Sequence, residues 1–102
     1  MARLSTHVLD TANGRPAAGV RIELRSGGVV RQTAATNADG RADFGEVEAG
    51  VYEFVFGIGD YFGIKNGFLR EVVVRFGVAD AAGRYHVPLL VSPYGYTTYR
   101  GS

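Results

Sequence analysis

Residues 84–102 read RYHVPLLVSPYGYTTYRGS, and the pattern of this stretch indicates the class of fold. It divides at Ser92-Pro93 into two runs, 84–91 and 94–101. One face of the first run carries Tyr85, Val87, Leu89 and Val91, and the other face carries His86, Pro88 and Leu90. A repeat of two residues is typical of a β-strand that separates two different environments. The stretch therefore predicts two paired strands at the carboxyl end.

The same alternation recurs upstream, in short segments separated by turn-forming residues. It predicts strands over 3–10, 20–25, 29–36, 41–44, 50–57 and 68–78. Turn signals such as Asn13-Gly14 and the run 37–40 lie between them. Residues 58–67 read as a loop with at most one short helix. About eight short strands at this spacing predict an all-β sandwich, and we expect a single domain over residues 1–102.

Length, charge and composition exclude several classes of function. The 102 residues carry a formal net charge of +1 with interspersed signs, so nucleic acid is not an expected partner. No apolar run approaches the roughly 18 residues of a membrane span, and the first residues enter a strand pattern directly, as in a chain without a signal peptide. The chain lacks cysteine, which is compatible with the cytoplasmic location that we expect.

The two histidines, His7 and His86, are the first candidates for chemistry. Each falls on the less apolar face of its strand, beside Ser5 and Leu9 in one case and Pro88 and Leu90 in the other. This position predicts that both point away from the core, toward an interface or a cleft. The alternative of two ordinary surface histidines stays open. Neither has the acidic or imidazole neighbours of a metal site, so we expect no metal and no cofactor.

General acid–base chemistry on water is what two imidazoles and an arginine can support unaided. Arg41 follows the turn at 37–40, where the backbone could hold its guanidinium in place. By itself this position also fits an ordinary solvated arginine. No Gly-x-Ser-x-Gly motif points to a serine nucleophile.

Four segments carry a resemblance to a known family: LSTHVLD at 4–10, TNADGR at 36–41, YHVPLLVSPYGY at 85–96 and YRGS at 99–102. They resemble the 5-hydroxyisourate hydrolases, the transthyretin-related enzymes of urate breakdown. The match covers nearly the whole chain in order, although 45–50 and 58–70 are shorter than is usual in that family. The resemblance implies a transthyretin-like β-sandwich of two four-stranded sheets. It also implies a homotetramer with active sites in a channel between dimers.

The resemblance also implies the site residues. The catalytic residues would be His7, Arg41 and His86. The substrate-binding residues would be His7 and Arg41 together with the terminal tetrad Tyr99, Arg100, Gly101 and Ser102. The implied reaction is hydrolysis of 5-hydroxyisourate to 2-oxo-4-hydroxy-4-carboxy-5-ureidoimidazoline. One histidine would activate water and Arg41 would stabilise the oxyanion; the sequence does not say which histidine is the base.

Two other functions are compatible with a β-sandwich of this size. The chain could be a transthyretin-like carrier without enzymatic activity, but a carrier channel is expected to hold aliphatic and hydroxyl side chains where this chain has His7 and His86. It could also be a structural or adhesive β-sandwich module of a larger protein. The absence of a linker segment and the functional character of the last strand make this the weaker alternative.

Overall fold

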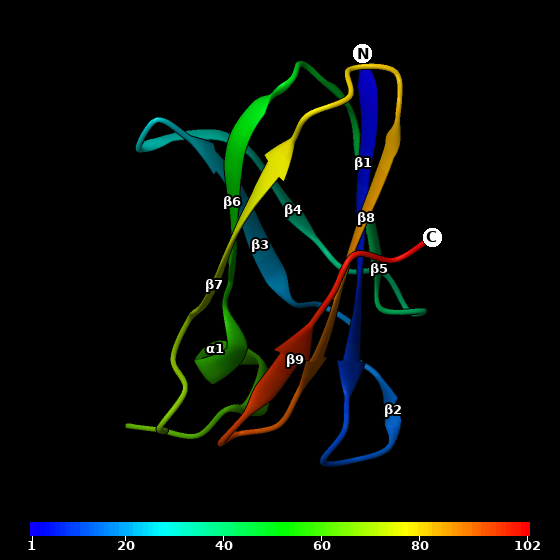
Figure 1. Cartoon of the computed structure of the whole chain (residues 1–102). Helices are drawn as coiled ribbons and strands as arrows, with labels where there is room; N and C mark the ends of the chain where they lie inside the picture. The colour runs from blue at the N-terminus through cyan, green and yellow to red at the C-terminus, as the bar shows by residue number, and fades with distance from the viewer.

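The computed structural model describes the whole chain, residues 1–102, as two β-sheets packed face to face with one short helix at one end (Figure 1). The elements in chain order are β1 (Ala2–Asp10), β2 (Arg15–Pro16), β3 (Arg21–Ser26), β4 (Val29–Ala35), β5 (Arg41–Val47), β6 (Gly50–Phe56), α1 (Ile58–Phe62), β7 (Val72–Val78), β8 (Arg84–Val91) and β9 (Tyr96–Thr98). The predicted all-β sandwich is confirmed, and α1 is the single short helix that residues 58–67 allowed. No helix of the structure has the length and apolar character that crossing a membrane requires.

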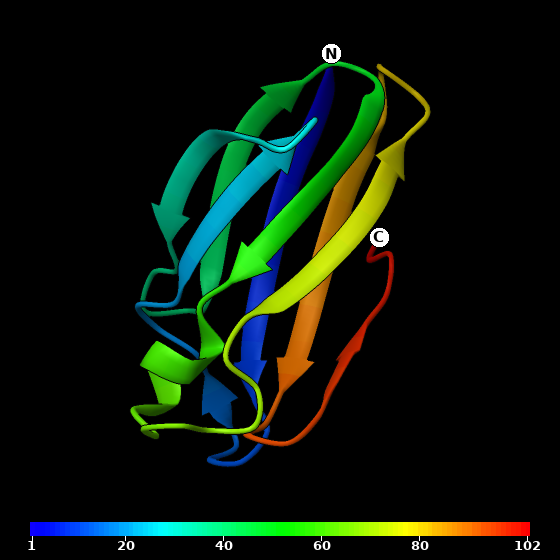
Figure 2. The ribbon, with the colours of Figure 1, turned by 90° about the vertical axis from the view of Figure 1, so that its left-hand side faces the viewer.

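The first sheet is built around β1. On one side β1 pairs in parallel with β8, which in turn pairs with β9; on its other side it pairs with β5 and with the two-residue strand β2. The second sheet has the order β4-β3-β6-β7. Figure 2 shows the two sheets as separate layers, with β6 and β7 in front of β1 and β8. The small strand β2 makes the first sheet five-stranded rather than four-stranded.

The alternation predicted from the sequence determines what is buried. Leu4, Thr6 and Val8 of β1 face the second sheet, whereas Ser5 and His7 point to the other side and are half-buried. The core between the sheets contains Ile22, Leu24, Phe44, Phe54, Phe56, Val72, Val74, Val87 and Leu89. The buried Thr6 hydroxyl donates to the Val87 carbonyl at 2.6 Å, so this polar group is satisfied across the β1–β8 pair.

Two strands are shorter than the sequence predicted. β7 begins at Val72 instead of residue 68, and Phe68 lies in the preceding loop with 74% of its surface exposed. β9 ends at Thr98, opposite Leu89, although the alternation continued to residue 101. The interruption of the ladder coincides with Pro88, which has no N–H to donate to the neighbouring strand. Pairing resumes in the same register at Gly101, which forms an isolated bridge with His86.

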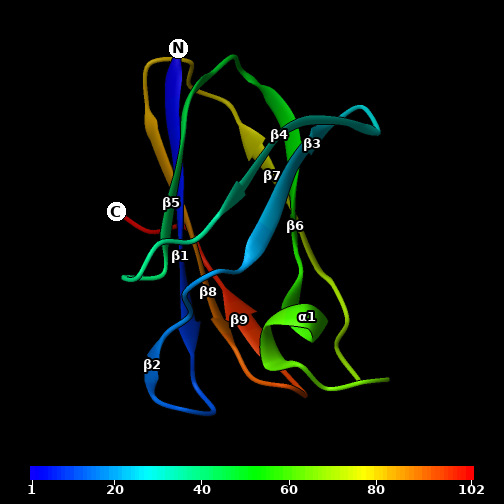
Figure 3. The same ribbon diagram turned by 180° about the vertical axis from the view of Figure 1, so that it is seen from behind.

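The carboxyl-terminal segment therefore follows β8 beyond the end of β9. Seen from behind, it leaves β9 and ends on the side of the first sheet that faces away from the second (Figure 3). This course brings residues 101 and 102 to the outer face on which His7 and His86 lie.

Helix α1 is attached to the end of β1 by a buried carboxylate. Asp10 is 1% exposed and accepts hydrogen bonds from the Tyr61 hydroxyl at 2.8 Å and from the backbone and side chain of Asn13. Burial alone would raise the pKa of Asp10, but these hydrogen bonds outweigh burial and hold its pKa below the usual range. A lowered pKa means that the contribution to stability is present at neutral pH and is lost as the pH falls through that pKa.

We expect Tyr61→Phe to lower the free energy of unfolding at pH 7 by about 1–3 kcal/mol, because the buried Asp10 carboxylate loses a donor. The difference from the parent protein should shrink as the pH falls and Asp10 becomes protonated. Chemical denaturation followed by circular dichroism measures both effects. Tyr94→Phe is the matched control, since Tyr94 is 77% exposed; equal stability of the two variants would contradict this role of Asp10.

Candidate active site

The outer face of the first sheet brings together three residues that are far apart in the sequence. His7 on β1 lies opposite Arg41 on β5, and Ser5 on β1 lies opposite His86 on β8. These three residues and Ser5 point outward from the sheet, because the residues next to them along the strands, Thr6, Ala42 and Val87, face the core. The proximity predicted for His7, Arg41 and His86 is therefore a consequence of strand register.

The His86 ring is held by the protein on two sides. Its Nδ1 lies 2.9 Å from the Ser5 hydroxyl oxygen. The Gly101 N–H donates to the His86 carbonyl at 2.8 Å, and the Gly101 backbone packs on the imidazole. A Cβ at position 101 would lie 2.6 Å from Cδ2 of the ring, so only glycine permits this approach without displacing the ring or the terminal segment.

The surroundings of His86 favour its neutral form. Burial lowers the pKa of His86, and electrostatic interactions with Arg41 and His7 lower it further. No hydrogen bond joins the second ring nitrogen, Nε2, to another protein group. The ring is thus a neutral imidazole at pH 7 with one nitrogen left for a ligand or a water molecule.

Arg41 combines a fixed backbone with a free side chain. The Asn37 side-chain oxygen accepts the N–H groups of Asp39 and Arg41, each at 3.0 Å. Gly40 has a φ of +75°, and a Cβ there would lie 2.5 Å from the Val8 carbonyl oxygen, so this tight turn requires glycine. The guanidinium itself makes no ion pair or hydrogen bond within the protein, unlike that of Arg3, which pairs with Asp43 at 2.7 Å.

A hollow of about 350 Å³ lies against these residues. Its lining consists of Arg3, Ser5, Arg41, Arg84, Tyr85, His86 and Ser102. Three of the seven are arginines, so the hollow favours a small molecule that is rich in oxygen atoms or carries negative charge. No three histidine or carboxylate side chains gather in the structure as metal ligands would.

The sequence-predicted residues divide into two groups. His86, Arg41 and Ser102 line the hollow; Gly101 packs on His86, and His7 lies next to Arg41 in the sheet. Tyr99 and Arg100 line a different hollow, of about 340 Å³, with Val74 and Phe76 of β7. The Arg100 guanidinium lies 4.3 Å from the centre of the Tyr85 ring and donates to the Arg84 carbonyl at 3.2 Å. Unlike the guanidinium of Arg41, it therefore already has partners within the protein.

Sequence reasoning missed four residues that line the hollow: Arg3, Ser5, Arg84 and Tyr85. A signal for three of them was present. Arg3 and Ser5 share the outward-facing alternation with His7, and Arg84 shares it with His86. Tyr85 belongs to the buried set and could not have been found in this way.

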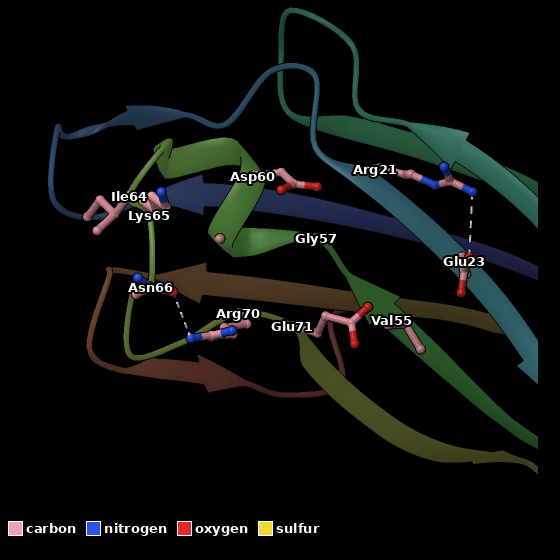
Figure 4. Close-up of a pocket in the computed structure, with 12 residues that line it drawn as sticks. Arg21, Glu23, Val55, Gly57, Asp60, Ile64, Lys65, Asn66, Arg70 and Glu71 are labelled. Carbon is pink, nitrogen blue, oxygen red and sulfur yellow. Dashed lines mark hydrogen bonds and ion pairs between the residues drawn. The ribbon is translucent and has the colours of Figure 1, made fainter.

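A larger hollow, of about 520 Å³, lies on the outer face of the second sheet beside α1 (Figure 4). Its lining mixes both signs of charge, and some of these side chains already have partners: Arg21 pairs with Glu23 at 3.5 Å, and Arg70 donates to Asn66 at 3.4 Å. It contains none of the sequence-predicted residues and no histidine. The smaller hollow on the first sheet is therefore the candidate active site.

Comparisons with known proteins agree on one family. Residues 4–101 match the HIUase/Transthyretin family. The chain is 55% identical to 5-hydroxyisourate hydrolase 2 of Rhizobium meliloti (strain 1021), over 98% of this chain and 96% of that protein. Among solved structures, 5-hydroxyisourate hydrolase of Klebsiella pneumoniae superposes with a TM-score of 0.90 at 35% identity, covering 100% of both chains.

Transthyretin from Sparus aurata has the same architecture, with a TM-score of 0.83 at 26% identity over 96% of this chain and 95% of that one. The transthyretin-like form of the sandwich, expected from the sequence, is thereby confirmed. On the full-length family match and these identities, the chain belongs to the HIUase/Transthyretin family.

Proposed function

We propose that the protein hydrolyses 5-hydroxyisourate, opening its six-membered ring to give 2-oxo-4-hydroxy-4-carboxy-5-ureidoimidazoline in urate catabolism. The observation that carries the proposal is a neutral imidazole, His86, that lies beside an unpaired guanidinium, Arg41, in one small hollow. The names of the relatives, 5-hydroxyisourate hydrolases at up to 56% identity, support the same reaction. The arginine-rich hollow is poorly suited to the apolar ligand of a carrier.

In the proposed reaction His86 acts as the general base. A water molecule attacks a ring carbonyl carbon and gives its proton to the imidazole, the ring carbon–nitrogen bond breaks, and the imidazolium returns the proton to the departing nitrogen. Arg41 would stabilise the negative charge that develops on the carbonyl oxygen, because its guanidinium has no other partner. His7, opposite Arg41, would contact the substrate from β1.

The terminal tetrad divides between two roles in this proposal. Gly101 and Ser102 would border the substrate, since Ser102 lines the hollow and Gly101 packs on His86. Tyr99 and Arg100 were predicted to bind substrate as well. The stacking of Arg100 on Tyr85 supports instead a role in holding the terminal segment in place, and contact of Tyr99 with substrate stays a prediction.

We also propose that the protein assembles as a homotetramer. β9 pairs only with β8 and leaves its other edge free, and Tyr94 and Tyr96 nearby are 77% and 47% exposed. Copies of the same chain would cover such surfaces. Light scattering at micromolar concentration should give four times the mass of one chain; a monomer that retains full activity would contradict the assembly.

The reaction is tested by ultraviolet spectroscopy of 5-hydroxyisourate freshly generated by urate oxidase. Because this substrate also decays spontaneously, the measured quantity is the rate with the protein relative to the rate without it. We expect acceleration in proportion to protein concentration. A rate equal to that of the blank would exclude the proposed function.

Three substitutions test the roles of the site. We expect His7→Ala, Arg41→Ala and His86→Ala each to reduce kcat/KM at least about tenfold, or about 1.4 kcal/mol of transition-state stabilisation. Arg31→Ala is the matched control for Arg41→Ala, because Arg31 is exposed on β4 in the other sheet. Circular dichroism should show an unchanged fold in all four variants. Full activity in any of the three site variants would remove that residue from the mechanism.

The pH dependence follows from the state of His86. A general base must be unprotonated, and the pKa of His86 lies below its usual value of about 6.5. Activity should therefore persist down to pH 6.5 and decline only at lower pH, as the imidazole takes up a proton. Steady-state rates between pH 5 and 8, corrected for the spontaneous reaction, measure this decline of activity at low pH. A decline that begins above pH 7 would mean that another group acts as the base.

A further inference from the structure

The contact between Ser5 and His86 has no role in the reaction as described so far. The Ser5 hydroxyl oxygen lies 2.9 Å from Nδ1 of the ring, and the two residues face each other across the parallel β1–β8 pair. β1 pairs with β8 in an unbroken register through Ser5, and its pairing with β5 continues from Ser5 after an irregularity between Leu4 and Ser5, so the backbone of Ser5 lies inside the sheet. The hydroxyl is thus a fixed partner for one particular nitrogen of the ring.

The second nitrogen is left for chemistry. The Gly101 backbone packs against the Cδ2 side of the imidazole, where a Cβ on residue 101 would lie only 2.6 Å from the ring. The imidazole therefore has little room to turn over. Nε2 has no protein hydrogen-bond partner, and the ring borders the hollow lined by Arg3, Arg41 and Arg84. With Nδ1 engaged by Ser5, Nε2 is the atom that can meet a water molecule.

The hydrogen bond between Ser5 and His86 can form in two directions. If the hydroxyl donates to Nδ1, the ring carries its proton on Nε2 and cannot accept one there. If Nδ1–H donates to the hydroxyl oxygen, Nε2 carries a lone pair. Arg41 and Arg84 line the hollow and have no ion-pair partner, and their positive charge favours the lone pair, because an N–H dipole directed at that charge is repelled.

We propose that Ser5 is a positioning residue that accepts a hydrogen bond from Nδ1–H of His86 and thereby holds Nε2 unprotonated as the base. The proposal rests on the proposed function for its consequence in catalysis. The tautomer of the ring is a property of the free protein and does not depend on any substrate.

A hydroxyl suits this task better than a carboxylate does in this electrostatic environment. A carboxylate on Nδ1 would also fix the tautomer, but its negative charge would stabilise the imidazolium and raise the pKa of the histidine. Ser5 is uncharged, so it orients the ring without opposing burial and the charge of Arg41, which favour the neutral imidazole. The orientation of the His86 ring and its charge are thus controlled by different parts of the site.

The direct test is nitrogen NMR of the protein labelled with ¹⁵N-histidine, without substrate and at pH 7.5. A ring nitrogen that carries a proton resonates well upfield of one that carries a lone pair, so the spectrum identifies the tautomer. We expect His86 to be protonated at Nδ1 in the parent protein. In Ser5→Ala we expect a mixture of the two tautomers, and in Ser5→Thr, which keeps the hydroxyl, the parent pattern. His86→Gln identifies the His86 signals.

The kinetic test uses the same variants. Ser5→Ala should lower kcat about tenfold, the equivalent of about 1.4 kcal/mol, with little change in KM, because the base is misoriented while Arg41 still binds. Ser5→Thr should restore most of the loss. Ser26→Ala is the matched control: Ser26 is on β3 in the other sheet, and its hydroxyl makes no hydrogen bond within the protein.

Two results would overturn the proposal: a parent protein with the proton on Nε2 of His86, or a Ser5→Ala variant with an unchanged tautomer and unchanged kcat. The tautomer of His86 is measured without substrate, so this part of the test does not depend on the identity of the substrate. If the parent protein fails to accelerate the decay of 5-hydroxyisourate, the proposed function fails, whereas the NMR result still decides whether Ser5 sets the tautomer.

Discussion

The parallel pairing of β1 with β8 is the constraint on which the site depends. Side chains alternate along a strand, so a slip of one residue would send Ser5 and His7 into the core and bring Thr6 to the outside. The buried hydrogen bond from the Thr6 hydroxyl to the Val87 carbonyl opposes such a slip, because that hydroxyl would lose its partner. One interior contact thus preserves the placement of Ser5 opposite His86 on the far side of the sheet.

Much of this arrangement could be predicted from single strands. The period of two residues correctly assigned Leu4, Val8 and Val87 to the core face and His7 and His86 to the outer face. It could do so because the buried face of a strand is apolar and its residues alternate with those of the outer face. The family resemblance singled out Arg41, which its position alone did not. The sandwich followed from the number and spacing of these segments, whereas the short helix α1 was allowed by residues 58–67 but not predicted.

What could not be predicted depends on contacts between strands. No local pattern shows that β1 lies between β5 and β8, and this order is what places Ser5 against His86. The early end of β9 depends on Pro88 in the neighbouring strand, and the course of the terminal segment depends on a glycine that can approach an imidazole. The stacking of Arg100 on Tyr85 likewise joins two segments whose proximity neither strand pattern shows.

The position of the site between β1 and β8 also has a consequence for the time course of folding. Ser5 and His86 are 81 residues apart in the chain, and the strands that carry them pair in parallel. Contacts of such long sequence separation cost loop-closure entropy before they contribute stability, and topologies dominated by them fold on the scale of milliseconds to seconds. The pair of residues comes together only when nearly the whole chain has been ordered, so a partly folded form of this protein would have strands and a collapsed core but no reactive histidine in place.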